Sequence, residues 1–308
     1  MLRKLIGFIF RLILLALVIG VPCTWMLSRS YKNPEVHYYQ VTQDRGEESL
    51  RFAVLSDLNG YIFAGGNSQI VEGVASVSPD AILMNGDMID PGAENVSFLV
   101  SLIERLSSIA PVYYAYGEQE YLYATDGAAN RSHRLTGETD KMLAFEKEIT
   151  EAGATVIREG YQDVMLYGIP VRIGSTDESA VNYTMGNGKL NPAKQKLHDF
   201  LAQFTNSESY KILLAHNIDH FLGASEEALT GTDLIVSGHL IGGRVVLPYF
   251  GGVFGGAQGY FPEYARGVLE KDGHDYLLSA GLSAIRDRIP RLNNPPEITV
   301  LDVNGLGR

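Results

Sequence analysis

The stretches RFAVLSDLNG (51–60) and DAILMNGDMID (80–90) decide the fold, because each is a short apolar run that stops at an aspartate. The aspartates are Asp57 and Asp87. Between the two runs, and again after the second, apolar residues recur at spacings of three and four, which is typical of amphipathic helices. The segment PVYYAYG (111–117) then repeats the apolar run. This succession of strand, helix, strand, helix and strand predicts an α/β fold.

The rest of the chain continues in the same style and shows no internal repeat. We expect helices over 69–77, 96–108, 140–152 and 191–204. Strands are expected in 163–175, where a Gly-Ile-Pro turn joins two of them, and in 210–216, 233–239, 244–248 and 297–303. Residues 265–281 have apolar strands on both sides of Lys-Asp-Gly-His, which predicts a hairpin.

Composition limits the classes of protein that this chain can be. Its 308 residues are 45% hydrophobic and 20% charged, so it can bury a sizeable core and is not a disordered chain. The net charge is −11, and because residues 1–32 hold five basic residues and no acid, the remainder carries −16. A domain that acidic repels polyanions, so no nucleic-acid partner is expected. A single cysteine excludes an internal disulfide framework and a Cys-rich zinc site.

The N-terminus is apolar from Leu5 to Leu27, apart from Arg11, Thr24 and a few small or turn-forming residues. Twenty-three residues at about 1.5 Å each span a hydrocarbon core of about 30 Å with some tilt. A cleaved signal peptide is the alternative, but no Ala-x-Ala site follows the apolar run, which favours an uncleaved anchor. Arg3, Lys4 and Arg11 lie toward the N-terminal side, and Arg29 and Lys32 on the other. This slight excess favours a single-pass protein with its globular part on the extracytoplasmic side.

These features divide the chain into three parts. Residues 1–29 are predicted to be a membrane anchor. Residues 30–49 are polar without a sustained helical period and are interpreted as a stalk. Residues 50–308 contain all the expected strands and helices of the globular domain.

Five potential metal ligands follow directly on apolar runs: Asp57, Asp87, Glu118, His216 and His239. In alternating α/β folds the ligand site lies outside the carboxyl ends of the strands. A single aspartate or histidine after a strand is usually a turn residue or a helix cap. Five at equivalent positions favour a shared metal site over five independent caps.

Five blocks of sequence then resemble those of the calcineurin-like metallophosphoesterases, in the same order and spacing. They are SDLNG (56–60), NGDMID (85–90), YGEQEY (116–121), LLAHNID (213–219) and SGHLIGGRVVLPY (237–249). The segments at 259–268 and 290–303 look like the membrane-anchored bacterial branch of that superfamily. The resemblance implies a four-layered α/β/β/α sandwich preceded here by one transmembrane helix. It also implies two metals bridged by one aspartate, and hydrolysis of a phosphomonoester or phosphodiester by a metal-bound hydroxide.

The family's first metal uses the positions of Asp57, Asn59, Asp87 and Ile241. The family has histidine where this chain has Asn59 and Ile241. Isoleucine has no lone pair to donate, and an amide oxygen is a weak neutral ligand compared with imidazole. The first metal site is therefore expected to be weak or empty.

The second metal uses the positions of Asp87, Glu118, His216 and His239, all of which can coordinate. Glu118 stands where the family has asparagine, and its charge is expected to strengthen this site. Two imidazoles and two carboxylates suit Zn²⁺, Mn²⁺ or Fe²⁺. The sequence thus predicts one tightly bound transition metal.

Two further positions bear on catalysis. The family has a histidine beside the phosphoryl group where this chain has Gln119, which can donate a hydrogen bond but cannot supply a proton near neutral pH. Losing general-acid help typically costs about 10²–10⁴ in rate. Arg244, where the family has glutamine, would compensate if its guanidinium held the phosphate; the alternative is an exposed arginine at the start of a strand. Asp57 would orient the attacking water or hold a loosely bound second ion.

Two hypotheses follow for the function. The first is a surviving phosphoesterase with one well-formed metal site, whose membrane anchor makes lipid-linked phosphoesters plausible substrates. The second is a pseudoenzyme that uses the fold as a membrane-anchored binding or scaffolding domain. Retention of every ligand position of one metal favours the first hypothesis. The second is favoured by the four substitutions at Asn59, Glu118, Gln119 and Ile241.

Overall fold

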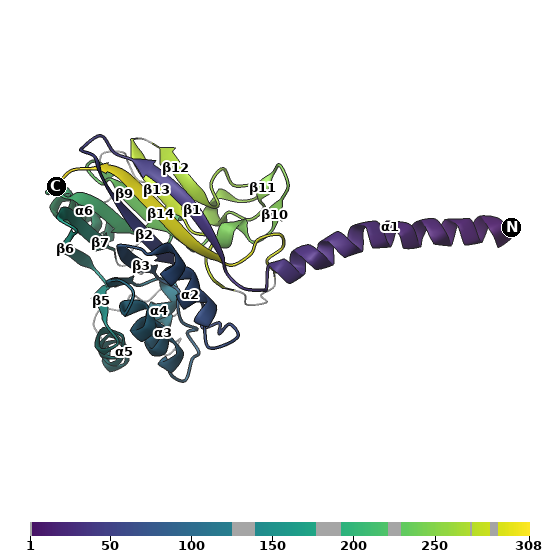
Figure 1. Ribbon diagram of the computed structural model, residues 1–308, viewed down its shortest axis with the longest axis horizontal. Helices are drawn as coiled ribbons and strands as arrows, with labels where there is room; N and C mark the ends of the chain where they lie inside the picture. Colours follow the sequence, from purple (N-terminus) through teal and green to yellow (C-terminus); the bar gives the residue numbers. More distant parts are fainter. Residues whose placement is uncertain (1, 125–138, 177–191, 221–228, 272, 284–288) are drawn as a thin grey trace.

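The computed structural model shows a sandwich of two six-stranded sheets, with one long helix leaving the domain (Figure 1). The structure describes residues 2–124, 139–176, 192–220, 229–271, 273–283 and 289–308. The first residue of the helix expected over 191–204 lies outside these ranges.

The first sheet has the strand order β1-β14-β2-β3-β4-β5, in which β14 is antiparallel to β2 and all other neighbours are parallel. Its strands are β1 (Glu35–Thr42), β2 (Glu48–Leu55), β3 (Ala81–Asn85), β4 (Val112–Ala115), β5 (Ala154–Ile157) and β14 (Glu297–Leu306).

The second sheet has the order β12-β13-β9-β8-β7-β6, parallel from β13 to β7 and antiparallel at both edges. Its strands are β6 (Gly160–Leu166), β7 (Ile169–Ser175), β8 (Tyr210–Leu214), β9 (Leu234–Ser237), β12 (Gly267–Lys271) and β13 (His274–Leu278). A separate antiparallel pair, β10 (Val246–Leu247) and β11 (Gly251–Gly252), stands outside both sheets.

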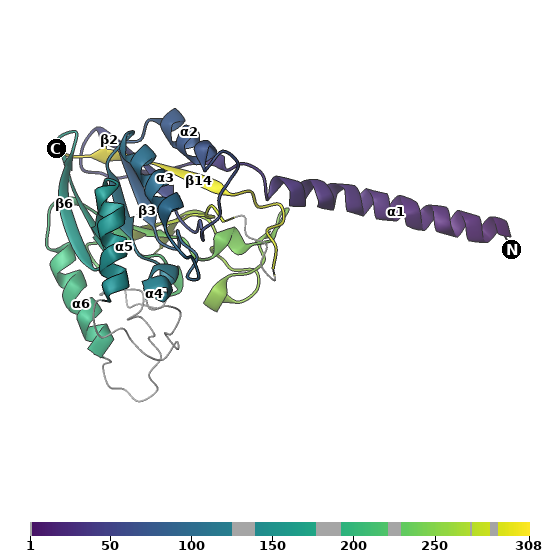
Figure 2. The same cartoon turned by 90° about the horizontal axis from the view of Figure 1, so that it is seen from below.

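Helices cover the two outer faces of the sandwich. The first sheet carries α2 (Ser68–Val77), α3 (Ser97–Ser107), α4 (Glu118–Ala124) and α5 (Asp140–Glu151), and the second carries α6 (Pro192–Thr205). In Figure 2, α3 and α5 lie over the first sheet and α6 lies beside β6. The expected four-layered α/β/β/α sandwich is confirmed.

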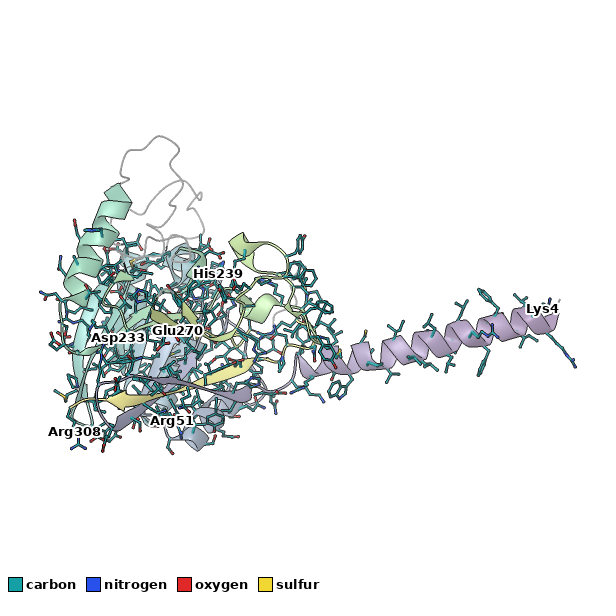
Figure 3. All side chains as sticks on the ribbon, turned by 90° about the horizontal axis from the view of Figure 1, so that it is seen from above. Lys4, Arg51, Asp233, His239, Glu270 and Arg308 are labelled. Carbon is teal, nitrogen blue, oxygen red and sulfur yellow. The ribbon has the colours of Figure 1, made fainter. Side chains whose placement is uncertain are left out.

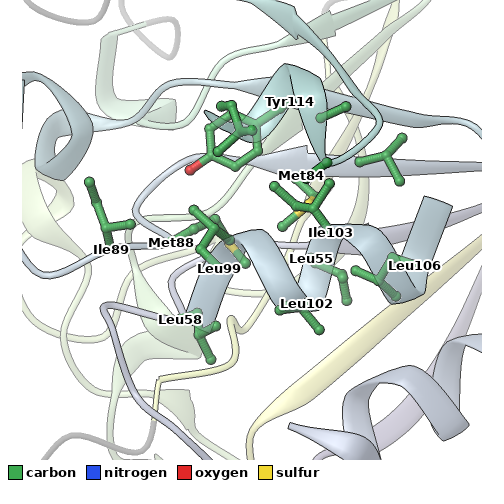
Figure 4. Close-up of a cluster of buried hydrophobic side chains, with 14 of the residues drawn as sticks. Leu55, Leu58, Met84, Met88, Ile89, Leu99, Leu102, Ile103, Leu106 and Tyr114 are labelled. Carbon is green, nitrogen blue, oxygen red and sulfur yellow. The ribbon is translucent and has the colours of Figure 1, made fainter. Parts of the chain in front are cut away.

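The layers follow from alternation along the buried strands. In β2, Phe52 and Val54 point into the core between the sheets, whereas Ala53 and Leu55 point toward the helices. A strand turns successive side chains to opposite faces, so a strand covered on both faces becomes a continuous apolar run. Figure 4 shows the helix-side core, where α3 packs against Leu55 and Met84. Leu55 and Met84 belong to β2 and β3, the apolar runs that end at Asp57 and Asp87 in the sequence.

The long N-terminal helix is α1 (Leu2–Arg29). Within Arg3–Arg29, the most apolar 18-residue window has a mean hydropathy of 2.5, and none of that window is buried in the protein. Among the described residues, α1 is the helix that is long and apolar enough to cross a bilayer.

The expectation of a stalk over residues 30–49 is wrong for residues 35–42. Those residues form β1, which pairs in parallel with β14 over its whole length, from Glu35 opposite Glu297 to Thr42 opposite Asn304. The strand has mostly half-exposed side chains because it lies at the sheet edge, so it lacks the apolar run of the central strands. A polar edge strand looks like a linker in sequence.

Removing β1 is therefore expected to destabilise the domain. Val41 alone is 5% exposed, and burying one valine side chain contributes about 1.5–3 kcal/mol. We expect a fragment of residues 30–308 to unfold cooperatively in urea. A fragment of residues 43–308 is expected to lose at least about 2 kcal/mol of unfolding free energy, because β14 loses its partner as well. Equal stability of the two fragments would restore the stalk interpretation.

Candidate metal centre

Four of the five predicted ligands meet at one edge of the sandwich. Asp57, Asp87, His216 and His239 each stand two residues beyond the end of a strand: β2, β3, β8 and β9 respectively. The first two strands are neighbours in one sheet and the last two are neighbours in the other. His239 lies on the opposite side of the domain from Arg308 (Figure 3).

The backbone is unusual at these strand ends. Asp57, Asp87 and His239 have φ values of 54°, 53° and 62°, in the left-handed region that side chains rarely adopt. Tight packing holds the turns in place: a Cβ on Gly117 would lie 2.4 Å from Asp87 Oδ1, and one on Gly238 would lie 2.4 Å from Asp57 Oδ2. Such strain concentrates at functional sites. Gly117 and Gly238, in the third and fifth sequence blocks, are therefore glycines because a side chain at either position would collide with an aspartate.

The imidazole of His216 is fixed by the opposite sheet. Its Nδ1 lies 2.7 Å from the carbonyl oxygen of Asn85. A carbonyl oxygen accepts only from a donor, so Nδ1 carries the hydrogen and Nε2 is turned to the carboxylates. Nε2 lies 3.1 Å from Asp87 Oδ2 and 3.7 Å from Asp57 Oδ1. A hydrogen bond from the far ring nitrogen to a carbonyl is the usual support of a metal-binding histidine.

Both carboxylates are buried, and their pKa values move in opposite directions. Burial raises the pKa of Asp57, and the charge of Asp87 adds to that rise while His216 opposes it. Burial also tends to raise the pKa of Asp87, but the charge of His216 and the hydrogen bonds from His216 and the Gln119 backbone lower it overall. The Gln119 N–H donates to Asp87 Oδ1 at 2.9 Å. Asp87 is thereby held as the ionised ligand of the pair.

His239 completes the cluster. Its backbone N–H donates to both oxygens of Asp57, at 3.0 and 3.2 Å, and its ring centroid lies 5.6 Å from that of His216. Asp87, His216 and His239 each offer a ligand atom, and these three atoms all lie within 4.8 Å of one another. The arrangement can hold one cation with two imidazoles and a carboxylate, with the carboxylate of Asp57 beside it.

The structure does not bring Glu118 into this cluster. Glu118 is exposed at the start of α4, although the sequence placed it among the ligands of the second metal. The buried glutamate of that turn is Glu120, which is 0% exposed. Its carboxylate accepts from the backbone N–H groups of Asp87, Met88 and Gly117 and from the Tyr114 hydroxyl, each at 2.8 Å.

Glu120 is thus a positioning residue that sequence reasoning missed. It ties the β3 turn that carries Asp87 to the β4 turn that carries Gln119. Residues 118–120 are Glu, Gln and Glu, and this short sequence does not indicate which side chain turns inward. The helical period of α4 decides this, because residues two apart on a helix lie on different faces.

The remaining predicted positions lie around the cluster. The Asn59 N–H donates to the Asp87 carbonyl oxygen at 2.8 Å, and Ile241 is 8% exposed in a short turn after His239. Gln119 is half-buried. The Arg244 Nη1 lies 3.4 Å from the carbonyl oxygen of Ile289, a long hydrogen bond that connects it to the segment before β14. The phosphate-holding role of Arg244 stays a prediction.

Comparison with known proteins gives one curated relative. The chain is 25% identical over 260 residues to the metallophosphoesterase YkuE of Bacillus subtilis, a match that covers 83% of this chain and 79% of the relative. No protein-family model matches the chain.

Solved structures give weaker matches. The phosphopantetheinyl hydrolase PptH of Mycobacterium tuberculosis is 12% identical, with a TM-score of 0.40 over 78% of this chain and 89% of that one. A 5′-nucleotidase precursor of Thermus thermophilus is 16% identical, with a TM-score of 0.42 over 76% of this chain and 49% of that one. At these scores the structural matches carry no part of the assignment.

A four-layered sandwich with aspartates and histidines gathered beyond the strand ends defines a protein of the metallophosphoesterase type. The relative is matched over about four fifths of both chains, and the five sequence blocks fall at the strand ends that build the cluster. These observations support an assignment to the calcineurin-like metallophosphoesterase superfamily.

The two glutamates of α4 provide a matched test of this geometry. Glu120→Gln would turn an amide nitrogen toward N–H donors, and a buried unsatisfied donor costs about 1–3 kcal/mol. We expect that loss in the free energy of unfolding, measured by urea denaturation. Glu118→Gln, two residues away and exposed, is expected to leave the stability unchanged. A larger loss for Glu118→Gln than for Glu120→Gln would contradict the structure's assignment of the buried glutamate.

Proposed function

We propose that this protein is a metal-dependent phosphoester hydrolase, acting on a phosphomonoester or phosphodiester and anchored in a membrane by α1. The observation that carries the proposal is the convergence of ligand atoms from Asp87, His216 and His239 within 4.8 Å at the strand ends. Similarity to a curated metallophosphoesterase over most of both chains supports phosphoester hydrolysis in general. The metal assignment and the residue roles below are parts of the proposal.

The donor set fits one divalent transition metal. Two imidazoles and a carboxylate, with Asp57 as a further carboxylate, suit Zn²⁺, Mn²⁺ or Fe²⁺. Such a metal supplies Lewis-acid chemistry: it polarises a phosphoryl oxygen and lowers the pKa of a coordinated water. A second metal would lack both family histidines, since Asn59 and Ile241 occupy those positions. We propose that the second metal is weakly bound or absent.

The chain's own residues orient this set before any ligand arrives. Asn85 fixes the His216 ring through Nδ1, the Gln119 backbone fixes one oxygen of Asp87, and the His239 N–H holds Asp57. Preorganised donors and acceptors of this kind cost no reorganisation during the reaction. The buried Asp57 carboxylate is the group that we propose to orient the attacking water.

Gln119 limits the range of substrates. Its side-chain amide can donate a hydrogen bond to a phosphoryl oxygen but has no titrating proton for a leaving group. Esters with good leaving groups are therefore the expected substrates. Because α1 would hold the domain at a bilayer, lipid-linked phosphoesters on the extracytoplasmic side belong to the same proposal.

Metal binding is the first test. Removing even an outer-shell partner of a metal site costs about 10–100-fold in affinity, so His216→Ala and His239→Ala are each expected to cost at least that much. Isothermal titration of the full chain with Zn²⁺ and Mn²⁺ would measure it, and the wild type is expected to bind close to one ion. Glu118→Gln is the control and is expected to bind as the wild type does. A loss in Glu118→Gln equal to that of the histidine variants would make Glu118 a ligand.

Hydrolysis is the second test, with a repair series that separates a retuned site from a damaged one. The wild type is expected to hydrolyse an activated aryl phosphate faster than an alkyl ester. Asn59→His with Ile241→His is expected to add a second bound metal. Adding Gln119→His is expected to raise alkyl-ester hydrolysis by up to about 10²-fold, because a general acid returns. Glu118→His, which places an imidazole at the exposed neighbour, is the control.

The outcomes separate the two hypotheses. If the wild type turns over and the repaired chains are slower, the site is adapted to one metal. If the wild type and the repaired chains all bind metal but hydrolyse no phosphoester, the proposal fails, and a membrane-anchored binding domain becomes the function that the fold supports.

A further inference from the structure

Four aromatic side chains are strongly exposed on one small part of the domain. Tyr249 is 105% exposed, Phe250 72%, Tyr260 75% and Phe261 55%. They belong to the β10–β11 pair and the chain that follows it, residues 245–262, which we call the aromatic hairpin. This segment contains no Asp, Glu, Lys, Arg or His, although the globular part of the chain is strongly acidic. An uncharged patch of large exposed aromatic residues marks a contact surface.

The aromatic hairpin lies at the end of the domain from which α1 leaves, in two views at right angles (Figures 1 and 2). Residues 291–294 connect the two directly. On one side, the Val246 N–H donates to the Leu292 carbonyl oxygen at 2.9 Å, and the Asn293 side chain donates to the Val246 carbonyl oxygen at 3.1 Å. The hairpin is therefore fixed to this segment at its base.

On the other side, the same segment holds the end of α1. The Asn294 N–H donates to the Ser30 hydroxyl, and the Arg291 N–H donates to the Tyr31 hydroxyl, both at 3.1 Å. Ser30 is fully buried, and its hydroxyl in turn donates to the Met26 carbonyl oxygen within the helix. The exit of α1 and the aromatic hairpin are thus bonded to one short piece of chain.

The level of the bilayer follows from α1. Trp25 is 59% exposed on the helix, and tryptophan prefers the membrane–water interface. It precedes Ser30 by five residues, about 7.5 Å along the helix axis. That distance matches one headgroup layer, since the polar layers add about 10–15 Å in total to the hydrocarbon core. The end of the domain that carries the aromatic hairpin therefore faces the headgroups.

We propose that the aromatic hairpin inserts Tyr249, Phe250, Tyr260 and Phe261 into the interfacial layer of the bilayer that α1 crosses. Tyrosine and phenylalanine place an apolar ring among the acyl-chain ends, and tyrosine keeps its hydroxyl in the headgroups. The absence of charge on the hairpin suits lipid rather than a basic or acidic partner protein. This inference rests on the proposal that α1 is a membrane anchor.

Docking has a consequence for the candidate metal centre. The hairpin continues directly from the turn that carries His239 and Ile241, and the Phe254 N–H donates to the Gly243 carbonyl oxygen at 3.1 Å. Two points of attachment, α1 and the hairpin, would fix the rotation of the domain about the helix. The site would then keep a constant orientation to the membrane surface.

The single tryptophan makes the test simple. In the full chain, Trp25→Phe gives a background without tryptophan, into which Tyr249→Trp or Tyr260→Trp is introduced. Tyr167→Trp is the matched control, because Tyr167 is 75% exposed, as Tyr260 is, and has a positive φ, as Tyr249 has. Tyr167 precedes Gly168, which lies beside Arg308, at the far end of the domain from α1 (Figure 3).

Each chain is reconstituted in vesicles of phosphatidylcholine brominated near the headgroup end of its acyl chains, which quench tryptophan on contact. We expect Trp at 249 and at 260 to be blue-shifted and to lose about as much fluorescence as Trp25 does in the wild type. Trp at 167 is expected to stay unquenched. Because the patch is uncharged, adding salt is expected to leave the quenching unchanged.

Quenching of Trp25 without quenching at 249 and 260 would overturn the docking proposal while leaving the anchor in place. Absence of quenching at all three positions would overturn both. Protection at 249 from a soluble quencher without quenching by the lipid bromines would show that a second copy or another protein covers the patch, and would also overturn the proposal.

Discussion

The hydrogen bond from His216 Nδ1 to the Asn85 carbonyl oxygen is the contact on which the site depends, because it joins the two sheets where their strands end. Asn85 closes β3 in the first sheet, and His216 follows β8 in the second. The Asn85 side chain adds a second connection, donating to the Val236 carbonyl oxygen of β9 at 2.9 Å. Two apolar sheets can slide against each other, since the hydrophobic effect has no direction. These polar contacts set one register, and that register brings a carboxylate from one sheet to imidazoles from the other.

Much of the local sequence serves to let the turns reach this position. Left-handed backbone at Asp57, Asp87 and His239 brings the strand ends close together. Such conformations cost of order 1–3 kcal/mol each and persist only where the surroundings fix them. Glu120 provides such fixing by collecting three backbone N–H groups from two turns. The strained turns are thus held in place by groups around the site rather than by the ligands themselves.

The same edge of the domain is connected to the N-terminal helix. Arg291 is buried and donates to the carbonyl oxygens of Asn294 in its own segment and of residues 280, 281 and 283 after β13, and burial lowers its pKa to about 10. The neighbouring Asn294 donates through its side chain to the Ile241 carbonyl oxygen at 2.8 Å and through its backbone N–H to the Ser30 hydroxyl. One segment thus contacts the turn after His239, the base of the aromatic hairpin and the exit of α1. If α1 is an anchor, the position of the membrane and the shape of the site are set by the same few hydrogen bonds.

The sequence by itself determined the alternation of elements, the anchor-like helix and the four ligand positions that converge, because each leaves a local signal: an apolar run, its period and the polar residue that ends it. It did not determine β1, whose half-exposed residues carry no apolar run and become a strand only because β14 offers an open edge. Nor did it separate Glu118 from Glu120, since both carboxylates fit the motif. Only the tertiary structure decided that one faces solvent and the other collects backbone N–H groups. Which glutamate is buried depends on the turns that lie next to α4, and these turns follow β3 and β4, which the fold brings side by side.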